Sequence, residues 1–83
     1  MIVSGQVQGV FFRDTCRREA GDRGVAGWVR NRADGTVEAV LEGEPEAVEQ
    51  VLAWMRTGPT SARVTGVRTS GEDPAGERDF SIR

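Results

Sequence analysis

A run of residues that contains two glycines and ends in an arginine is the part of this 83-residue sequence best suited to bind an anion. Gly5 and Gly9 come just before a segment with helical spacing, and Arg13 falls in the first turn of that expected helix. Unpaired backbone N–H groups and the helix dipole attract anions at such a position, and a guanidinium there grips two phosphate oxygens. The alternative interpretation is that this run is an ordinary turn followed by a surface arginine and binds no ligand.

The rest of the composition leaves few groups for acid–base, covalent or metal chemistry. All 11 basic residues are arginines, and the chain contains no histidine, so a histidine base is excluded. The single cysteine, Cys16, has no partner for a disulfide or a zinc site and no base to activate it, so we expect a small buried hydrophobic residue. We therefore expect no cofactor and no metal.

The charge is spread unevenly along the chain. The net charge of −2 argues against general binding to nucleic acid, which depends on excess positive charge. Residues 1–33 nevertheless carry a charge of +3, whereas residues 34–83 carry −5. A basic first third in an acidic protein suits a small anionic ligand.

The secondary structure that would position these residues is expected to follow the order strand, helix, strand, strand, helix, strand, with a short strand appended. Strands are expected at 2–7, 25–32, 37–42 and 62–69 and at the chain end around 80–82, with a bulge near Gly66. One helix should begin at Phe12 and stop at Gly24, and another should begin at Pro45 and end by Gly58. Asp34-Gly35 predicts a hairpin turn, and residues 71–77 predict a polar surface loop.

This order predicts one α+β domain over residues 1–83, a ferredoxin-like βαββαβ sandwich. Two helices would pack on one face of a mainly antiparallel sheet of four to five strands. Eighty-three residues are too few for a second core. No run approaches the roughly 20 apolar residues that span a bilayer, and no signal peptide is evident, so we expect a cytoplasmic protein without membrane contact. Small size and a polar surface favour a monomer.

Two motifs resemble those of the acylphosphatase family. Val7 to Arg13, read as Val-Gln-Gly-Val-x-Phe-Arg, resembles the family's loop signature, and Gly27-Trp28-Val29-Arg30-Asn31 resembles its second signature. Asp34-Gly35-Thr36-Val37, Gly58-Pro59 followed by Ala62 and Val64, and the Phe80-x-Ile82 ending also match the family pattern. The resemblance covers nearly the whole chain, and the family's ferredoxin-like fold agrees with the element order above.

The resemblance implies a metal-independent hydrolase that cleaves acyl phosphates to carboxylate and inorganic phosphate. The Arg13 side chain and backbone amides of the loop would hold the phosphoryl group, and Asn31 would position the attacking water. The loop residues concerned are Gln8, Gly9, Val10, Phe11 and Phe12. The side chains of Phe12, Trp28 and the apolar stripe of the second helix would then belong to the core. Arg30 and Arg32 alternate with Asn31 and should point to the other face of their strand.

Hydrolysis of an acyl phosphate requires few catalytic groups. The leaving carboxylate has a conjugate acid with a pKa of about 4, so it needs no proton from the protein. The remaining task is to orient water and to stabilise charge on the phosphoryl oxygens. Asn31 orients water but accepts no proton, so we hypothesise that a phosphate oxygen of the substrate is the final proton acceptor.

Some features depart from the family pattern or leave the function open. Only six residues precede Val7, so the first strand is short, and Arg23 stands where the family usually has an apolar residue. The runner-up function is a non-catalytic ferredoxin-like module that binds a small anion or a protein. An RNA-binding sheet is disfavoured, because it would need exposed aromatic residues and positive charge. Nothing in the sequence selects among acetyl, carbamoyl and phosphoglyceroyl phosphates.

Overall fold

The computed structural model describes residues 1–9, 11–71 and 76–83 of the chain. Its elements follow the predicted order of strands and helices. They are β1 (Ile2–Gln6), α1 (Phe12–Asp22), β2 (Ala26–Asn31), β3 (Val37–Glu42), α2 (Pro45–Met55), β4 (Arg63–Arg68) and β5 (Phe80–Ile82). The prediction for residues 71–77 lies mostly outside the described residues.

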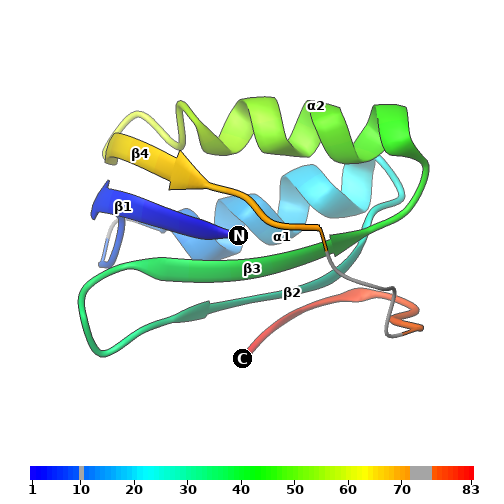
Figure 1. Cartoon of the computed structure of the whole chain (residues 1–83), viewed down its shortest axis with the longest axis horizontal. Helices are drawn as coiled ribbons and strands as arrows, with labels where there is room; N and C mark the ends of the chain where they lie inside the picture. Colours follow the sequence, from blue (N-terminus) through cyan, green and yellow to red (C-terminus); the bar gives the residue numbers. More distant parts are fainter. Residues whose placement is uncertain (10, 72–75) are drawn as a thin grey trace.

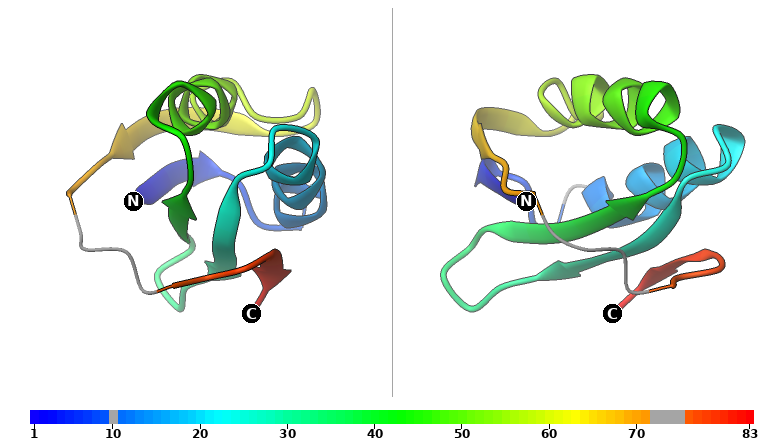
Figure 2. Two further views of the ribbon diagram at one scale, coloured as in Figure 1. Left: turned by 90° about the vertical axis from the view of Figure 1, so that its right-hand side faces the viewer. Right: turned by 45° about the vertical axis from the view of Figure 1, so that its right-hand side comes forward.

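The strands form one five-stranded sheet in the order β4-β1-β3-β2-β5. β1 pairs antiparallel with β3 and β4, β2 pairs antiparallel with β3, and β5 adds to β2 in parallel. Both helices lie on one side of this sheet, as Figure 1 and the two turned views in Figure 2 show. The predicted α+β sandwich with a mainly antiparallel sheet is confirmed.

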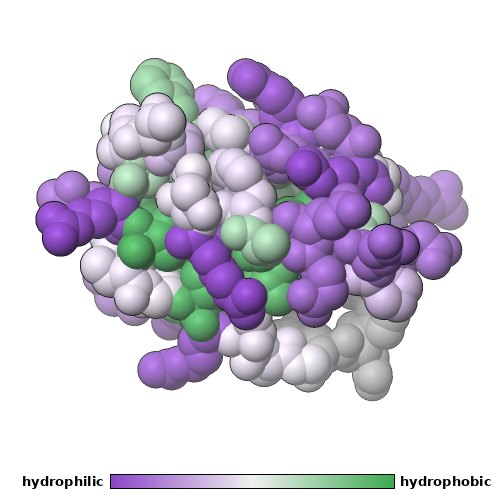
Figure 3. Space-filling view, turned by 90° about the horizontal axis from the view of Figure 1, so that it is seen from above, coloured by the Kyte–Doolittle hydropathy of each residue, from purple (hydrophilic) through white to green (hydrophobic). Residues whose placement is uncertain are grey.

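The core lies between the sheet and the two helices. Residues from all three parts are fully buried, among them Val29 and Val37 from the sheet, Phe12 from α1 and Met55 from α2. The ring centres of Phe12 and Trp54 lie 5.3 Å apart, and this contact joins the two helices. Seen from the helix side, hydrophilic side chains cover most of the surface, and hydrophobic residues show only as patches between them (Figure 3).

Glycine ends α1 as the sequence predicted. Gly24 has φ 68, a left-handed conformation that glycine adopts without steric cost. The N–H of Val25 donates to the carbonyl of Ala20, and the N–H of Gly24 donates to the carbonyl of Gly21. This pair of hydrogen bonds is the Schellman pattern, which satisfies carbonyls that the end of a helix leaves free. The chain therefore turns directly from α1 into β2.

The short strand β1 lies inside the sheet and pairs with a neighbour on each side. It pairs with β4 from Ile2 to Gln6, with a register shift between Ser4 and Gly5 that leaves an extra residue on β4 next to Gly66. The predicted bulge is confirmed. Toward β3 the ladder covers only two residue pairs, and Met1 extends it by exchanging two backbone hydrogen bonds with Ala39. The last residues of β3 therefore continue beyond the start of β1.

The prediction that Trp28 belongs to the core is wrong. Trp28 is half-buried and lies outside the core cluster, with the guanidinium groups of Arg30 and Arg83 5.4 Å and 5.0 Å from its ring centre. It shares one face of β2 with Arg30, because side chains alternate along a strand, and the helices cover the opposite face. Arg23, the other departure from the family pattern, is half-buried and pairs with Glu19 one turn earlier.

Candidate active site

No side chain of the N-cap residue accepts a hydrogen bond from the backbone N–H groups at the start of α1. Phe11 is the N-cap residue and makes no side-chain capping hydrogen bond. Both the backbone N–H and the hydroxyl of Thr15 donate to the Phe11 carbonyl, at 3.0 and 2.9 Å. The first amides of a helix have no acceptor within the helix, so a ligand that enters here finds free N–H donors and the positive end of the dipole.

The backbone before α1 turns through two left-handed residues. Gly9 has φ 71, and Phe11 has φ 60, the only positive φ of a non-glycine residue within the described chain. A bulky side chain in this conformation costs about 1–3 kcal/mol, and such residues are concentrated at functional sites. This conformation was not predictable from the sequence, because phenylalanine rarely adopts it.

Arg13 lies in the first turn of α1 with its side chain half-buried. It makes no ion pair within the described chain, whereas Arg23, Arg30, Arg32 and Arg83 each pair with a carboxylate. Its charge is therefore available to an anion. Arg13 lines a cavity of 270 Å³ whose wall is formed by Val7, Gly9, Phe11, Phe12, Arg13, Asp14 and Ile82.

The side chain of Gln8 ties this loop to the β2–β3 hairpin. Its amide nitrogen donates to the carbonyls of Arg32, at 2.7 Å, and Thr36, at 3.0 Å. Arg32 directly follows Asn31, the last residue of β2. The loop before α1 and the end of β2 therefore lie at the same end of the molecule, on the left in Figure 1. From the sequence we expected only the backbone of Gln8 to contact the ligand. No sequence pattern predicted the hydrogen bonds from its side chain to the hairpin.

Asn31 lies on the face of β2 that the helices cover. Val29, two residues earlier, is fully buried on that face, and the alternation of side chains places Asn31 on the same side. The carboxamide oxygen of Asn31 is buried and has no hydrogen-bond partner among the described residues. A buried acceptor without a partner costs about 1–3 kcal/mol, so this oxygen favours a ligand or water that donates to it.

The hairpin between β2 and β3 has the turn that Asp34-Gly35 predicted. The carboxylate of Asp34 accepts hydrogen bonds from the hydroxyl and the backbone N–H of Thr36, at 2.6 and 3.0 Å. These bonds lower the pKa of Asp34 below its usual value. Because Gln8 donates to the carbonyl of Thr36, the same turn supports the loop before α1.

The structure brings most, but not all, of the predicted site residues around one cavity. Gly9, Phe11, Phe12 and Arg13 line it, while Gln8 supports the loop from outside and Asn31 lies outside the wall. Val10 lies outside the described residues. The sequence missed Ile82 as a lining residue, because no local pattern shows that β5 would pack beside the start of α1.

Cys16 takes no part in this site. It is fully buried on α1, and burial, with a smaller effect of the nearby Glu19 carboxylate, raises its pKa to about 12. A thiol with so high a pKa is not a nucleophile near neutral pH. The expectation of a small buried hydrophobic residue is confirmed.

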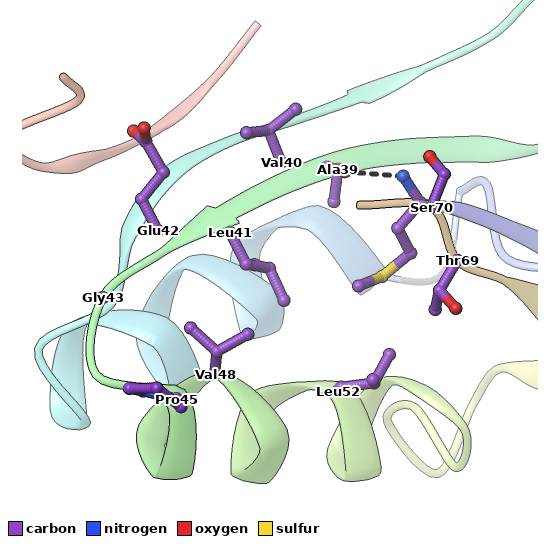
Figure 4. A pocket seen from close by; sticks show the side chains of 11 residues that line it. Ala39, Val40, Leu41, Glu42, Gly43, Pro45, Val48, Leu52, Thr69 and Ser70 are labelled. Atoms are coloured by element: carbon purple, nitrogen blue, oxygen red, sulfur yellow. Dashed lines mark hydrogen bonds between the residues drawn. The ribbon is translucent and has the colours of Figure 1, made fainter. Parts of the chain in front are cut away.

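A second cavity, of 340 Å³, lies between the end of β3 and α2 (Figure 4). Leu41, Val48 and Leu52 give it apolar walls, and no arginine lines it. Its carboxylate, that of Glu42, already accepts hydrogen bonds from the backbone N–H groups of Gly76 and Glu77. The amino terminus of Met1 also lines it, but that group donates to the carbonyl of Ala39. No guanidinium is placed here to bind a phosphate ligand.

Comparison with known proteins identifies the family of this chain. The family model described as acylphosphatase matches residues 1–82. The chain belongs to the acylphosphatase family. It is 55% identical over 83 residues to an acylphosphatase of Rubrobacter xylanophilus, an alignment that covers 98% of this chain and 74% of that protein. It is 52% identical over 80 residues to the Thermococcus kodakarensis acylphosphatase, covering 96% of this chain and 88% of the other.

The fold of a solved acylphosphatase agrees with this assignment. The crystal structure of the Bacillus subtilis acylphosphatase superposes with a TM-score of 0.93 at 40% identity, covering 99% of this chain and 92% of that one. Family and fold together support acyl phosphate hydrolysis as the activity of this acylphosphatase domain. Among the described residues, no group of three or more histidine, cysteine, aspartate or glutamate side chains is placed to hold a metal ion. No helix in the described ranges is long and apolar enough to cross a membrane.

Proposed function

We propose that this chain hydrolyses acyl phosphates without a metal ion, using Arg13, the amides of residues 8–12 and Asn31. The observation that carries the proposal is the cavity at the uncapped start of α1, where Arg13 makes no ion pair with any residue that the structure describes. The bridge from Gln8 to the carbonyl of Arg32 holds this loop beside the strand end that bears Asn31. A cation, amides at the uncapped start of a helix, and a carboxamide oxygen without a partner in the described part of the chain thus occur at one end of the molecule.

Each group has one task in the reaction. Arg13 and the loop amides bind the phosphoryl oxygens and stabilise their charge in the loose transition state. The carboxamide oxygen of Asn31 accepts a hydrogen bond from the attacking water and orients it. The water oxygen bonds to phosphorus as the bond from phosphorus to the acyl oxygen breaks. The leaving group departs as a carboxylate, and the proton of the water passes to a phosphate oxygen, giving inorganic phosphate.

This mechanism needs no metal ion and no titrating group of the protein. The carboxylate leaves without a proton, because its conjugate acid has a pKa of about 4. The positive charge comes from the guanidinium of Arg13. The chain has no histidine, and Cys16 keeps its proton because its pKa is about 12.

The experiment is an assay of the purified chain with acetyl phosphate, with and without a chelator, between about pH 6 and 8. We expect turnover that the chelator leaves unchanged and that shows no single ionisation beyond that of the substrate. Loss of activity with chelator would contradict metal independence, and a single protein ionisation would require an enzyme base. Phosphate binding without turnover would instead indicate the non-catalytic anion-binding module.

A further inference from the structure

Part of one edge of β3 has no partner strand, because β3 continues beyond the start of β1. The ladder between β1 and β3 covers two residue pairs, and Met1 exchanges two more backbone hydrogen bonds with Ala39. On its other edge, β3 pairs with β2 as far as Glu42. Among the residues that the structure describes, no backbone pairs with the β1 edge of β3 beyond Ala39.

The backbone of Leu41 points to this open edge. The N–H and C=O groups of successive residues in an antiparallel sheet point alternately to the two edges of the strand. Both groups of Ale39 bond to Met1, so both groups of Leu41, two residues later, point to the same side. An unpaired donor and acceptor at a strand edge form a template for another extended chain.

The cavity of 340 Å³ lies directly beside this edge. The side chains of Leu41, Val48 and Leu52 point into it from β3 and α2 (Figure 4). Thr69 and Ser70, which follow β4, also line it. The left view of Figure 2 shows the start of β1 between β3 and the stretch after β4. The space in line with β1 therefore has backbone on two sides and apolar side chains on the side of the helices.

These features fit an extended peptide. One peptide residue opposite Leu41 would exchange two backbone hydrogen bonds with it, as in an antiparallel ladder. Residues directly opposite each other place their side chains on the same face, so the side chain of this residue enters the cavity. Main-chain pairing combined with a pocket for a side chain is the way in which strand addition recognises peptides. Because Met1 occupies the position opposite Ala39, the peptide ends or turns away one residue after the one opposite Leu41.

The carboxylates at the far end of the site favour a basic residue in the peptide. In the antiparallel register, the peptide residue before the apolar one lies opposite Glu42, on the open face of the sheet. Glu44 follows at the start of α2, and no arginine lines the cavity. An arginine at this peptide position therefore complements the charge of the site.

We propose that the space in line with β1, between β3 and residues 69–70, is a docking site for an extended peptide of a partner protein. The peptide carries an arginine followed directly by a large apolar residue and runs antiparallel to β3. It pairs with Leu41 and places its apolar side chain against Val48 and Leu52. The site lies at the opposite end of β1 from the loop before Arg13, so this inference is independent of the proposed hydrolysis.

The test titrates the ¹⁵N-labelled chain with the peptide acetyl-Arg-Leu-Thr-amide and follows the amide NMR signals. We expect saturable binding with a Kd of about 1 mM or tighter. The largest shifts should occur at Leu41 and at residues 69–70, and the amide proton of Leu41 should move downfield as it gains an acceptor.

Two altered peptides separate the side-chain contact from the backbone contact. Serine in place of the peptide leucine should weaken binding by at least about tenfold, because the cavity then receives no apolar group. N-methylation of that leucine removes the N–H that donates to the carbonyl of Leu41 and should weaken binding to a similar extent.

Variants of the chain locate the site. Val48→Phe fills the cavity with an aromatic ring and should weaken binding of the unaltered peptide by at least about tenfold. Ala53→Phe adds the same ring at an exposed position of α2 outside the cavity and should leave the Kd unchanged. Cooperative unfolding of both variants checks that they are folded.

Three results would overturn the proposal. The first is no binding at concentrations about fivefold above the expected Kd. The second is equal binding of the N-methylated peptide, or equal binding to the Val48→Phe protein. The third comes from joining the same three residues to the nitrogen of Met1. If the segment shifts the Leu41 amide only when it is joined in this way, the site accepts a longer first strand and not a separate partner.

Discussion

In the proposed mechanism Arg13 binds the phosphoryl group and Asn31 orients the attacking water, so variants of the two residues should fail differently. Arg13→Ala should abolish phosphate binding and lower turnover by at least about 10³-fold, since it removes the charge that holds the phosphoryl group. Asn31→Ala should lower turnover by about a hundredfold while inorganic phosphate still binds. Steady-state kinetics and phosphate inhibition constants provide the measurement.

A matched arginine controls for the general loss of positive charge. Arg68 is exposed on β4 and pairs with Ile2, at the opposite end of β1 from the loop, so Arg68→Ala should leave turnover and phosphate inhibition unchanged. Wild-type activity in folded Arg13→Ala or Asn31→Ala protein would contradict their assignment.

Residue types and spacing predicted much about individual residues, but not their conformations. The single cysteine without a base predicted the buried role of Cys16, and Asp34-Gly35 predicted a turn. The left-handed backbone of Phe11 was not predictable, because tertiary structure imposes it against the residue's own preference. Trp28 was assigned to the core from the family resemblance and its apolar ring, yet that ring packs against two guanidinium groups on the open face of the sheet.

The loop before α1 depends on the hairpin to which Gln8 binds. Gln8→Ala removes two hydrogen bonds to backbone carbonyls, so we expect the free energy of unfolding to fall by about 1 kcal/mol. Turnover should fall about tenfold, since a small displacement of the loop misplaces the bound phosphoryl group. Denaturant unfolding and kinetics measure the two effects. Gln50→Ala, at an exposed position on α2, is the control, and an equal effect of both variants would contradict the bridge.

Two glycines in neighbouring elements should respond in opposite directions to replacement by alanine. Gly27 in β2 has φ 137, and an added Cβ would overlap the carbonyl oxygen of Val40, so Gly27→Ala should cost about 3 kcal/mol or more. Gly21 in α1 has open space around it and no positive φ, so Gly21→Ala should stabilise the fold by about 0.5–1 kcal/mol. Thermal or denaturant unfolding measures both, and a tolerated Gly27→Ala would contradict the close approach of β2 and β3.

Elements were predictable where local signals were strong. Pro45 and the apolar stripe of α2, Gly24 after α1 and the alternation in β3 each fixed an element from its own residues. Pairing between distant segments carries no such signal. The parallel addition of β5 to β2, which brings Ile82 to the site, follows from the packing of the whole sheet.

Burial in the core keeps the thiol of Cys16 neutral. The free energy of unfolding should therefore depend on pH in the alkaline range. Its pKa rises from the ordinary value of 9.0 to about 12 on folding, so the thiol contributes full stability below pH 9 and loses it as the pH rises toward 12. The free energy of unfolding should fall by up to about 1.4 kcal/mol per pH unit in that range. The chain has no lysine or tyrosine to titrate there as well.

Unfolding at several pH values tests this effect. In Cys16→Ala protein the decline between pH 9 and 11 should largely disappear, although the variant is less stable at neutral pH because it leaves a small cavity. A wild-type stability that stays level over the same range would show that Cys16 ionises inside the fold without cost.

The central claim is that water attacks phosphorus while Arg13, the loop amides and Asn31 hold it in place. Hydrolysis of an acyl phosphate in water enriched in ¹⁸O tests it most directly, because the label shows which bond breaks. We predict one labelled oxygen in the inorganic phosphate and none in the carboxylate. Label in the carboxylate would show attack on the acyl carbon, and the account of the site would then be wrong.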